Sequence, residues 1–351
     1  MAWKLLACPS AGLDIGSYSV KLLVRQSRPG AGGWSVAEAP IEGAEAGIPP
    51  TPERVAAAIS QCLSRAGLSP QTIGGITTGI AGPHVVIKEL VLPPLEDREV
   101  GPALRFEARK HVPFDPQGMV IDYQVLGRHQ EDRRLKVLLA AASEEQIERH
   151  LAPLRLVGVE PRILEATPLA LTNALLEAGE NNGDAQALLD IGYTTSHLTL
   201  HQPDVPYFTR RLDFGGHHLT RAIAAARRLP LDEAETWKLA AGSETSGTDV
   251  AWDGPEWQAM LDCLRIELMA ELRRSFAFYR TIGPLPEPLR VRISGGSARL
   301  PGLAARVGEL LGSETQVFDP LVGVRGGITG PLEPSAGPQF SQAYGLALRT
   351  A

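Results

Sequence analysis

The chain has 351 residues, of which 44% are hydrophobic, and this is enough for roughly two domains with substantial cores. Its formal net charge of −6 argues against wholesale binding to nucleic acid or to an anionic membrane, because both select basic patches. The three cysteines, Cys8, Cys62 and Cys263, are far apart and odd in number, so they predict neither a disulfide framework nor a metal site and are typical of a reducing cytosol.

No stretch of about 18 consecutive apolar residues occurs, so we expect no transmembrane helix. The N-terminal "MAWKLLACPSAGLDIG" has one lysine and a very short apolar run, which makes it a poor signal peptide. We therefore expect a cytoplasmic protein without direct membrane insertion, which contacts a membrane only through a partner.

Strand-like and helix-like segments alternate along the chain, as is typical of an α/β fold. Residues 12–25 predict a hairpin whose turn follows Asp14. The segment "TPERVAAAISQCLSRAG" predicts a helix that is entered through Thr51 and Pro52 and ends at Gly67.

Residues 95–155 form a separate insert in this interpretation, a small module of helix, two strands and helix. Its last helix begins with Ser143 and Gln146, three positions apart, which is the spacing of a capping box. Residues 163–179 predict a further helix, and the hydrophilic stretch 177–186 predicts a linker.

The opening pattern then recurs in "ALLDIGYTTSHLTL" (187–200), where Asp190 lies about half the chain length after Asp14. This repetition predicts two related halves that face each other. In the second half a glycine pair opens a helix, residues 255–281 have the apolar spacing of a long helix, and "RISGGSARLPGL" predicts a strand, a glycine turn and a helix. The predicted division is a lobe I core (1–94 and 156–183), the inserted subdomain (95–155), a lobe II core (184–215 and 284–351) and a lobe II helical subdomain (216–283).

The two hairpin turns are the main candidate site. Glycine and small residues let a turn approach a ligand closely and point successive N–H groups at it, which makes an anion nest. Two such turns that face each other could hold a chain of phosphates, each aspartate could hold hydrated Mg²⁺, and a lysine could neutralise a phosphate. The phosphate candidates are Gly16, Ser17, Tyr18, Ser19 and Lys21 in the first turn and Gly192, Tyr193, Thr194 and Thr195 in the second, and the metal candidates are Asp14 and Asp190.

Three further elements complete the candidate site. Gly215 and Gly216 precede a helix, whose N-terminus suits phosphate. A second glycine turn could face the nucleoside, and a carboxylate with an arginine and a serine on one face of the long helix could contact ribose and adenine. The residues are Gly295, Gly296, Ser297 and Arg299 in the turn and Glu271, Arg274 and Ser275 on the helix. Taken singly, each element is more often an ordinary turn or a solvated ion pair than a binding site, and only their joint order is specific.

That joint order resembles the actin-like nucleotide-binding superfamily, with "LDIGSYSVKL" as phosphate-1, "LLDIGYTTSHLTL" as phosphate-2 and "RISGGSARLPGL" as the adenosine motif. The resemblance implies a two-lobed actin-like (ribonuclease H-like) α/β fold with ATP and Mg²⁺ in the cleft. It also implies an acidic residue near the γ-phosphate on the helix before phosphate-2, where Glu165 falls as the catalytic candidate. A plain helix N-terminal carboxylate is the alternative interpretation of Glu165.

The insert is similar to that of the PilM family of type IV pilus proteins, through "LVLPPLE", "FEARK", "VPF" and "DYQVLG". "ELRRSFAFYR" and "AYGLALR" resemble the same family. The resemblance implies an FtsA/PilM-type inserted subdomain that binds the cytoplasmic N-terminal peptide of PilN, an inner-membrane protein that pairs with PilO. It leaves open a homo-oligomer or ring and contact with the pilus motor ATPases.

An apolar peptide could add to a sheet edge or lie in a groove between the insert helix and the strand around 121–126. The partner candidates are Phe106, Phe114, Tyr123 and Val125, which could instead be the core of the module itself. His197 and Tyr193 are bulky for phosphate-2, and apart from Glu165 and the motif aspartates nothing is placed to activate a water, so we expect slow or negligible ATP hydrolysis. The rival functions are an FtsA-like filament protein, for which the C-terminal "GLALRTA" comes too early for a membrane helix, and a small-molecule phosphotransferase.

Overall fold

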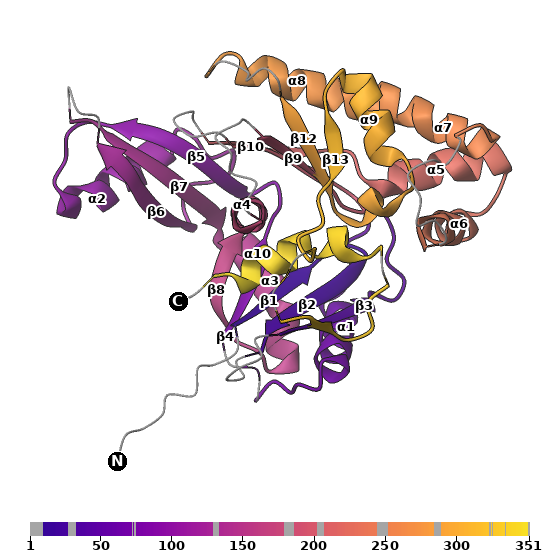
Figure 1. Ribbon diagram of the computed structural model, residues 1–351. Coiled ribbons are helices and arrows are strands. Elements are labelled where there is room, and N and C mark those ends of the chain that lie inside the picture. The colour runs from indigo at the N-terminus through magenta and orange to yellow at the C-terminus, as the bar shows by residue number, and fades with distance from the viewer. Residues whose placement is uncertain are drawn as a thin grey trace.

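The computed structural model describes residues 10–26, 33–71, 73, 75–128, 133–178, 186–201, 207–243, 252–283, 289–322, 324, 326–333 and 335–349. Cys8 and most of the predicted linker lie outside these residues. Within the described ranges the strands form three sheets, two of which make the facing lobes of Figure 1 while the third forms a module that projects from lobe I.

Lobe I is a sheet in the order β14-β3-β2-β1-β4-β8 with helices on both faces. One face packs on α1 and α3, and the other packs on α4 and α10, so the central strands are buried on both sides. The strands are β1 (Ser10–Ile15), β2 (Ser19–Arg25), β3 (Trp34–Pro40), β4 (Gly75–Ile80), β8 (Pro161–Ala166) and β14 (Ile328–Thr329). The helices are α1 (Pro52–Arg65), α3 (Glu144–Val157), α4 (Thr167–Glu177) and α10 (Ser341–Ala347).

Lobe II is a sheet in the order β11-β10-β9-β12-β13, and its core is continuous with the helices that cover it. The strands are β9 (Gln186–Ile191), β10 (Ser196–His201), β11 (Phe208–Leu212), β12 (Arg290–Ser294) and β13 (Thr315–Val317). The helical elements are α5 (Gly216–Arg227), α6 (Leu231–Ser243), α7 (Pro255–Cys263), the π-helix η1 (Leu264–Leu268), α8 (Met269–Tyr279), the 3-10 turns η2 (Gly296–Arg299) and η3 (Gly337–Phe340), and α9 (Leu303–Leu311).

The two lobes repeat one strand arrangement. In lobe I, β1 pairs antiparallel with β2, β2 pairs antiparallel with β3, and β4 lies parallel to β1 on its other side. In lobe II, β9, β10, β11 and β12 stand in the same order and directions. The prediction of two related halves from the repeated Asp-Ile-Gly pattern is therefore confirmed.

The projecting module is a three-stranded sheet in the order β5-β7-β6, with α2 packed on one face. Its core is formed by side chains such as Leu104 of α2 and Val137 and Leu139 of β7. The elements are β5 (Val85–Leu92), α2 (Asp97–Ala108), β6 (Met119–Arg128) and β7 (Leu135–Ser143). The module thus begins at β5 rather than at 95, and α3, predicted within the insert, packs chiefly on α1 of lobe I.

Most local predictions hold. Helix α1 begins at Pro52 after Thr51 as N-cap, and Gly67 follows its end with a φ of +68°. Ser143 caps α3 by accepting a hydrogen bond from the Gln146 N–H at 3.2 Å, while the Gln146 side chain donates to the Ala81 carbonyl instead of closing the box. The predicted long helix forms as α7, a π-helical turn and α8.

One helix prediction is wrong at its start. Residues from Pro161 to Ala166 form strand β8, and the helix begins only at Thr167. The parallel pairing of β8 with β4, which places Glu165 opposite Gly79, is a long-range interaction that outweighs the helical appearance of the local sequence. Glu165 therefore lies on a strand and not at a helix N-terminus.

Candidate functional site

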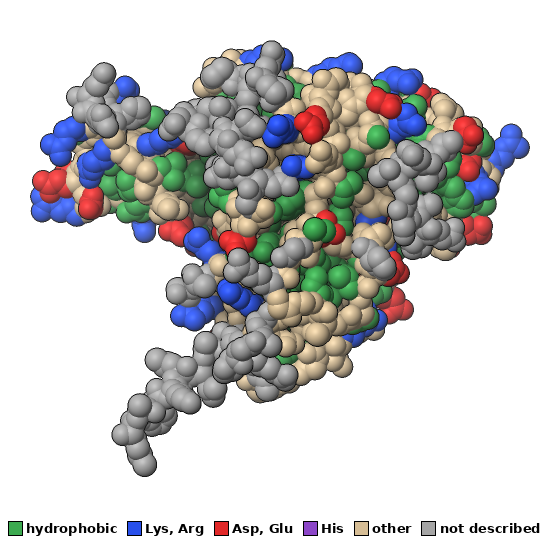
Figure 2. Space-filling model, in the orientation of Figure 1, with side chains coloured by type: hydrophobic (Ala, Val, Ile, Leu, Met, Phe, Trp, Pro, Cys, Tyr) green, Lys and Arg blue, Asp and Glu red, His purple; other side chains and the backbone are tan. Residues whose placement is uncertain are grey.

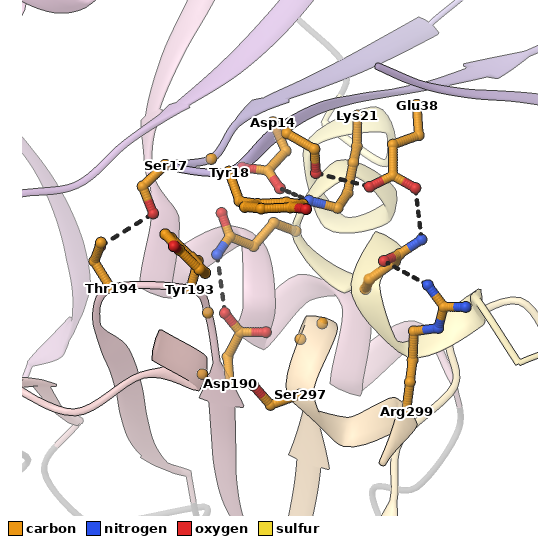
Figure 3. A pocket seen from close by; sticks show the side chains of 18 of the residues that line it. Asp14, Ser17, Tyr18, Lys21, Glu38, Asp190, Tyr193, Thr194, Ser297 and Arg299 are labelled. Atoms are coloured by element: carbon orange, nitrogen blue, oxygen red, sulfur yellow. Dashed lines mark hydrogen bonds and ion pairs between the residues drawn. The ribbon is translucent and has the colours of Figure 1, made fainter. Parts of the chain in front are cut away.

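A cavity of about 710 Å³ lies between the two lobes (Figure 3). It is lined from both lobes, and it brings together most of the residues that the sequence singled out. From the predicted set these are Asp14, Gly16, Ser17, Tyr18, Ser19, Lys21, Asp190, Gly192, Tyr193, Thr194, Thr195, Gly216, Gly295, Gly296, Ser297 and Arg299.

The first turn is closed by a hydrogen bond from the Gly16 N–H to the Ser19 carbonyl at 3.1 Å. A Cβ on Gly16 would lie 2.9 Å from that same carbonyl, so a side chain would force the turn open. Within the described part of the chain, the N–H groups of Ser17 and Tyr18 have no backbone acceptor. They are therefore available to an anion in the cavity.

The second turn repeats this geometry. The Gly192 N–H donates to the Thr195 carbonyl at 3.1 Å, and a Cβ on Gly192 would lie 2.8 Å from that carbonyl. The Gly192 and Tyr193 carbonyls accept hydrogen bonds from the Gly216 and His217 N–H groups, at 2.8 and 2.9 Å. The first N–H groups of α5 thus support the second turn, so the prediction that this helix end offers them to phosphate is wrong. Gly215, the N-cap, does not line the cavity in the described structure.

The two turns contact each other across the cleft. The Ser17 and Thr194 hydroxyl oxygens are 3.0 Å apart, and the Tyr18 and Tyr193 rings lie 4.9 Å apart between centroids. Lys238 of α6 also contacts this ring, with its ammonium 5.8 Å from the Tyr193 ring centroid.

Asp14 and Asp190 are both buried at the inner end of the turns. Burial raises the pKa of Asp14 to about 6, and the nearby Asp190 and Glu38 charges act in the same direction. The Lys21 ammonium, whose Nζ lies 3.8 Å from Asp14 Oδ2, acts in the opposite direction and lowers this pKa. Asp190 accepts hydrogen bonds from the Ser294 hydroxyl at 2.8 Å and from the Gln342 amide at 2.9 Å. Burial lowers the pKa of His197, the strand partner of Asp190, so this imidazole is neutral at pH 7.

A third carboxylate, Glu38, which belongs to no recognisable sequence motif, lies beside them. Asp14, Lys21 and Glu38 lie directly opposite one another on β1, β2 and β3, so their side chains form one row on the cavity face of the sheet. Glu38 accepts hydrogen bonds from the Ser19 hydroxyl at 2.7 Å and from the Gln339 amide at 2.8 Å. The cavity therefore combines two glycine turns with buried carboxylates and the Lys21 ammonium.

The far end of the cavity is built by the second glycine turn and by α6. Gly295 has a φ of +88°, and a Cβ there would lie 2.5 Å from the Ile191 carbonyl, so glycine is required. Arg299 pairs with Glu333 and lies 3.5 Å from the Gln339 amide oxygen.

Two α6 residues that sequence reasoning missed also line this end. Lys238 is buried, Glu235 is partly buried, the two are joined at 2.7 Å, and burial lowers the pKa of Lys238. An acid and a base three positions apart on a helix is the same pattern that predicts a nucleoside contact at Glu271 and Arg274.

The long-helix residues are not brought to the cavity. Glu271 and Arg274 form an ion pair on α8, and the Ser275 hydroxyl donates to the Glu271 carbonyl at 2.7 Å, so these three polar groups satisfy one another outside the lining. The prediction that they contact a nucleoside is wrong because α8 covers lobe II at a distance from the cleft (Figure 1).

Glu165 is likewise absent from the lining. It is buried beside α4 and the residues that follow α10, where Oε1 is 3.3 Å from Asn173 Nδ2 and 3.8 Å from Arg349 Nε, and burial raises its pKa. Thr167, two positions later, lines the cavity instead. The structure therefore does not support a catalytic position for Glu165.

The four partner candidates of the module are not its core. Phe106 is 66% exposed on α2, and Tyr123 and Val125 are about 40% exposed on β6, the edge strand. Phe114 is half-buried against His84, with ring centroids 5.5 Å apart. The sheet face turned away from α2 adds Val91 and Val120, each about half exposed, and hydrophobic side chains gather over the module in Figure 2.

A magnesium ion fits the oxygen-donor chemistry of Asp14 and Asp190, with water completing the coordination. Within the described residues no group of three or more His, Cys, Asp or Glu side chains is placed as a ready-made metal cluster. None of the described helices has the length and apolar character that crossing a bilayer requires.

Two lobes with the same strand order, joined around a cleft between two glycine turns, define an actin-like protein with a two-lobed α/β fold. The same fold occurs in the ethanolamine utilization protein EutJ from Carboxydothermus hydrogenoformans, at 16% identity and a TM-score of 0.56, over 97% of this chain and 89% of that chain. More specifically, the chain belongs to the PilM family of type IV pilus assembly proteins, whose family model matches residues 12–351.

A chain of the solved PilM-PilN type IV pilus biogenesis complex is 28% identical, with a TM-score of 0.79 and 97% of each chain covered. The cell division protein FtsA of Neisseria meningitidis is 26% identical over 68% of this chain, which spans 62% of that protein. FtsA of Streptococcus pneumoniae is 23% identical over 90% of this chain and 76% of that protein.

Proposed function

We propose that the chain is an ATP-binding scaffold of the type IV pilus machine, and that ATP with Mg²⁺ binds in the inter-lobe cavity. The observation that carries this proposal is the direct contact between the two glycine turns, one from each lobe. Phosphates placed there meet N–H groups from both turns together with the Lys21 ammonium, and Asp14 and Asp190 face the metal. The nucleoside occupies the far end, beside Gly296, Ser297, Arg299 and the α6 pair Glu235 and Lys238.

We further propose that the nucleotide is structural or regulatory and is hydrolysed slowly or not at all. Hydrolysis needs a positioned water as well as bound phosphates. Of the cavity carboxylates, Asp190 and Glu38 each accept two hydrogen bonds from neutral donors. His150, which also lines the cavity, has its pKa lowered to about 4 by burial, so it is a weak base. A steady turnover above about 1 s⁻¹, ordinary for an enzyme, would contradict this.

The partner in this proposal is the cytoplasmic N-terminal peptide of PilN, bound by the module β5–β7. The support is the likeness to a chain of a PilM–PilN complex together with an unpaired sheet edge. On β6 one edge of backbone groups is free of a neighbouring strand within the described sheet, and such an edge can accept an extended peptide. Through PilN the chain would be held at the inner membrane from the cytoplasmic side and linked indirectly to PilO.

Apolar side chains flank this edge on both faces. On the α2 face they are Tyr123 and Val125, with Phe106 exposed on α2 itself, and on the opposite face it is Val120. A strand added to β6 would direct alternate side chains to the two faces, so a peptide with apolar residues at every second position has contacts on each.

The experiment is a pull-down of the full chain on an immobilised PilN N-terminal peptide, with and without Mg-ATP, together with equilibrium binding of a fluorescent ATP analogue. We expect both ligands to bind, and Asp14→Ala to abolish nucleotide binding while the protein stays folded. No peptide binding in either state would refute the partner, and unchanged nucleotide affinity in Asp14→Ala would refute the site. ATP-dependent filaments without peptide binding would instead favour the FtsA-like alternative.

A further inference from the structure

The segment that ends the described chain crosses from lobe II to lobe I. On the lobe II side, η3 is fixed by the Gly295 N–H, which donates to the Pro338 carbonyl at 3.0 Å. On the lobe I side, α10 packs so closely that a Cβ on Gly12 would overlap the Ala343 carbonyl, and one on Gly345 would overlap the Ala170 carbonyl. The passage between the lobes therefore falls where η3 ends and α10 begins, at 340–341.

Two glutamines on either side of this passage bond to opposite lobes. Gln339, on the lobe II side, donates from Nε2 to Glu38 Oε2 of lobe I at 2.8 Å. Gln342, on the lobe I side, donates from Nε2 to Asp190 Oδ2 of lobe II at 2.9 Å. The two hydrogen bonds therefore cross, and a rotation of one lobe about the passage has to break or stretch both.

Both carboxylates are also fixed from their second oxygen by a serine of their own lobe. The Ser19 hydroxyl donates to Glu38 Oε1 at 2.7 Å, and the Ser294 hydroxyl donates to Asp190 Oδ1 at 2.8 Å. Arg299 adds a contact of 3.5 Å to the Gln339 amide oxygen, so a continuous polar chain runs from the first turn to the second glycine turn. Figure 3 shows Glu38, Asp190 and Arg299 around the same cavity.

We propose that Gln339 and Gln342 form a crossed brace between the lobes, which positions Glu38 and Asp190 and so sets the lobe angle at which the cavity binds its ligand. The lobe angle follows from the hydrogen bonds themselves, and only the effect on nucleotide rests on the proposed function. Neutral amides suit this role because they donate to a carboxylate without cancelling its charge. Both glutamines are positioning residues, since they act through the carboxylates they hold.

Exchanging the amide and the carboxylate of the Gln339–Glu38 pair tests this brace, because one substitution should break it and the second should restore it. In Gln339→Glu, a second carboxylate would face Glu38 at hydrogen-bond distance, and the repulsion between like charges in this partly buried place would drive the lobes apart. In the double variant Glu38→Gln/Gln339→Glu the pair is reversed, so an amide again donates to a carboxylate. The double variant therefore returns the lobes to their original angle.

The test measures the lobe angle as a distance in the full chain. Spin labels are placed on an exposed helix position of each lobe, through Gln61→Cys in α1 and Ala305→Cys in α9. Cys8→Ser prevents labelling at Cys8, and Cys62 and Cys263 are buried. The distance distribution between the labels is recorded by pulsed electron resonance without nucleotide. We expect a longer, broader distribution for Gln339→Glu and recovery in the double variant. Gln316→Glu, the same charge change on exposed β13, should leave the distribution unchanged. An unchanged distribution in Gln339→Glu, or no recovery in the double variant, overturns the brace.

Should Gln339→Glu not fold, Gln339→Met, which removes the hydrogen bonds without adding charge, is judged by the same lengthening. A second readout is the affinity for a fluorescent ATP analogue with Mg²⁺, which should fall at least about tenfold in Gln339→Glu and return in the double variant. If the unsubstituted chain fails to bind the analogue, the nucleotide proposal fails, while the distance measurements still decide the brace. Normal affinity in a variant whose lobes have moved apart would overturn the link between brace and ligand.

Discussion

The Ser17 and Thr194 hydroxyl oxygens lie 3.0 Å apart, although 177 residues separate them in the chain. Each stands at the tip of an Asp-x-Gly turn, and the two turns have the same closing hydrogen bond. A repeated local motif has thus become a single inter-lobe site, and this relationship is the basis for the predictions that follow.

Substitutions at the neighbouring glycines Gly295 and Gly296 should have different effects, one on protein stability and the other on ligand binding. A Cβ on Gly296 meets nothing within 4 Å, whereas one on Gly295 would lie 2.5 Å from the Ile191 carbonyl. We predict that Gly296→Leu, whose side chain would fill the cavity, lowers ATP affinity at least about tenfold with an unchanged melting temperature, because only the ligand loses contacts. Gly295→Val should lower the melting temperature itself. Calorimetry of both variants checks this, and full affinity in Gly296→Leu would misplace the site.

Ionisation of the buried Asp14 carboxyl should lower the stability of the ligand-free protein as the pH rises. Its pKa is raised from 3.8 to about 6, so between these values the folded state holds a proton that the unfolded state has released, and stability falls as pH rises. The difference corresponds to roughly 3 kcal/mol above pH 6. Asp14→Asn should therefore stabilise the ligand-free protein strongly at pH 8 and little at pH 4, as measured by urea unfolding. A benefit equal at both pH values would contradict this.

The buried pair Glu235–Lys238 should behave as a coupled unit. Lys238 Nζ also donates to the Gly216 carbonyl and the Thr220 hydroxyl, at 2.9 and 2.7 Å. Lys238→Met leaves the largely buried Glu235 carboxylate without its cation, which we expect to cost up to about 3 kcal/mol. Adding Glu235→Leu should recover part of that loss, and a double-mutant cycle from urea unfolding measures it. Strict additivity would show that the two side chains act independently.

A pair of changes locates the peptide on the module. Val120→Asp places a charge on the exposed β6 face opposite α2, and Phe106→Ser removes the exposed ring on α2. If the peptide adds to the β6 edge, both changes should weaken binding by about tenfold or less, because each removes contacts on one face only. Phe278→Ser, at an exposed ring on α8, is the matched control. Equal weakening by the control would show non-specific adhesion.

Glu165→Gln should leave both ATP affinity and the slow turnover unchanged. The carboxylate lies beside Asn173 of α4 and Arg349, and among the described residues its Oε2 has no hydrogen-bond partner, so an amide of the same shape replaces it without disturbing the cavity. Steady-state phosphate release measures the turnover. A tenfold fall in turnover with unchanged folding would return Glu165 to a catalytic role.

The sequence predicted the parts of the site that are local. Each of the two glycine turns is a contiguous Asp-x-Gly hairpin, so its shape follows from a few adjacent residues such as Gly16 and Gly192. The capped start of α3 at Ser143 is local in the same way.

The parts that depend on long-range packing could not be predicted. The spacing of an acid and a base on one helical face occurs both in α8, at Glu271 and Arg274, and in α6, at Glu235 and Lys238, and only the packing of α6 at the cavity selects the second. Glu38 carries no motif, and it joins the site only because β3 pairs with β2 in the register that puts it opposite Lys21.

Titration calorimetry of the PilN N-terminal peptide into the full chain, with and without Mg-ATP, tests the central claim most directly. We predict saturable binding of one peptide per chain, weakened in Val120→Asp and unaffected in Phe278→Ser. The absence of binding heat in both nucleotide states, confirmed at a second temperature, would contradict the proposal that this chain is a peptide-binding scaffold of the pilus machine.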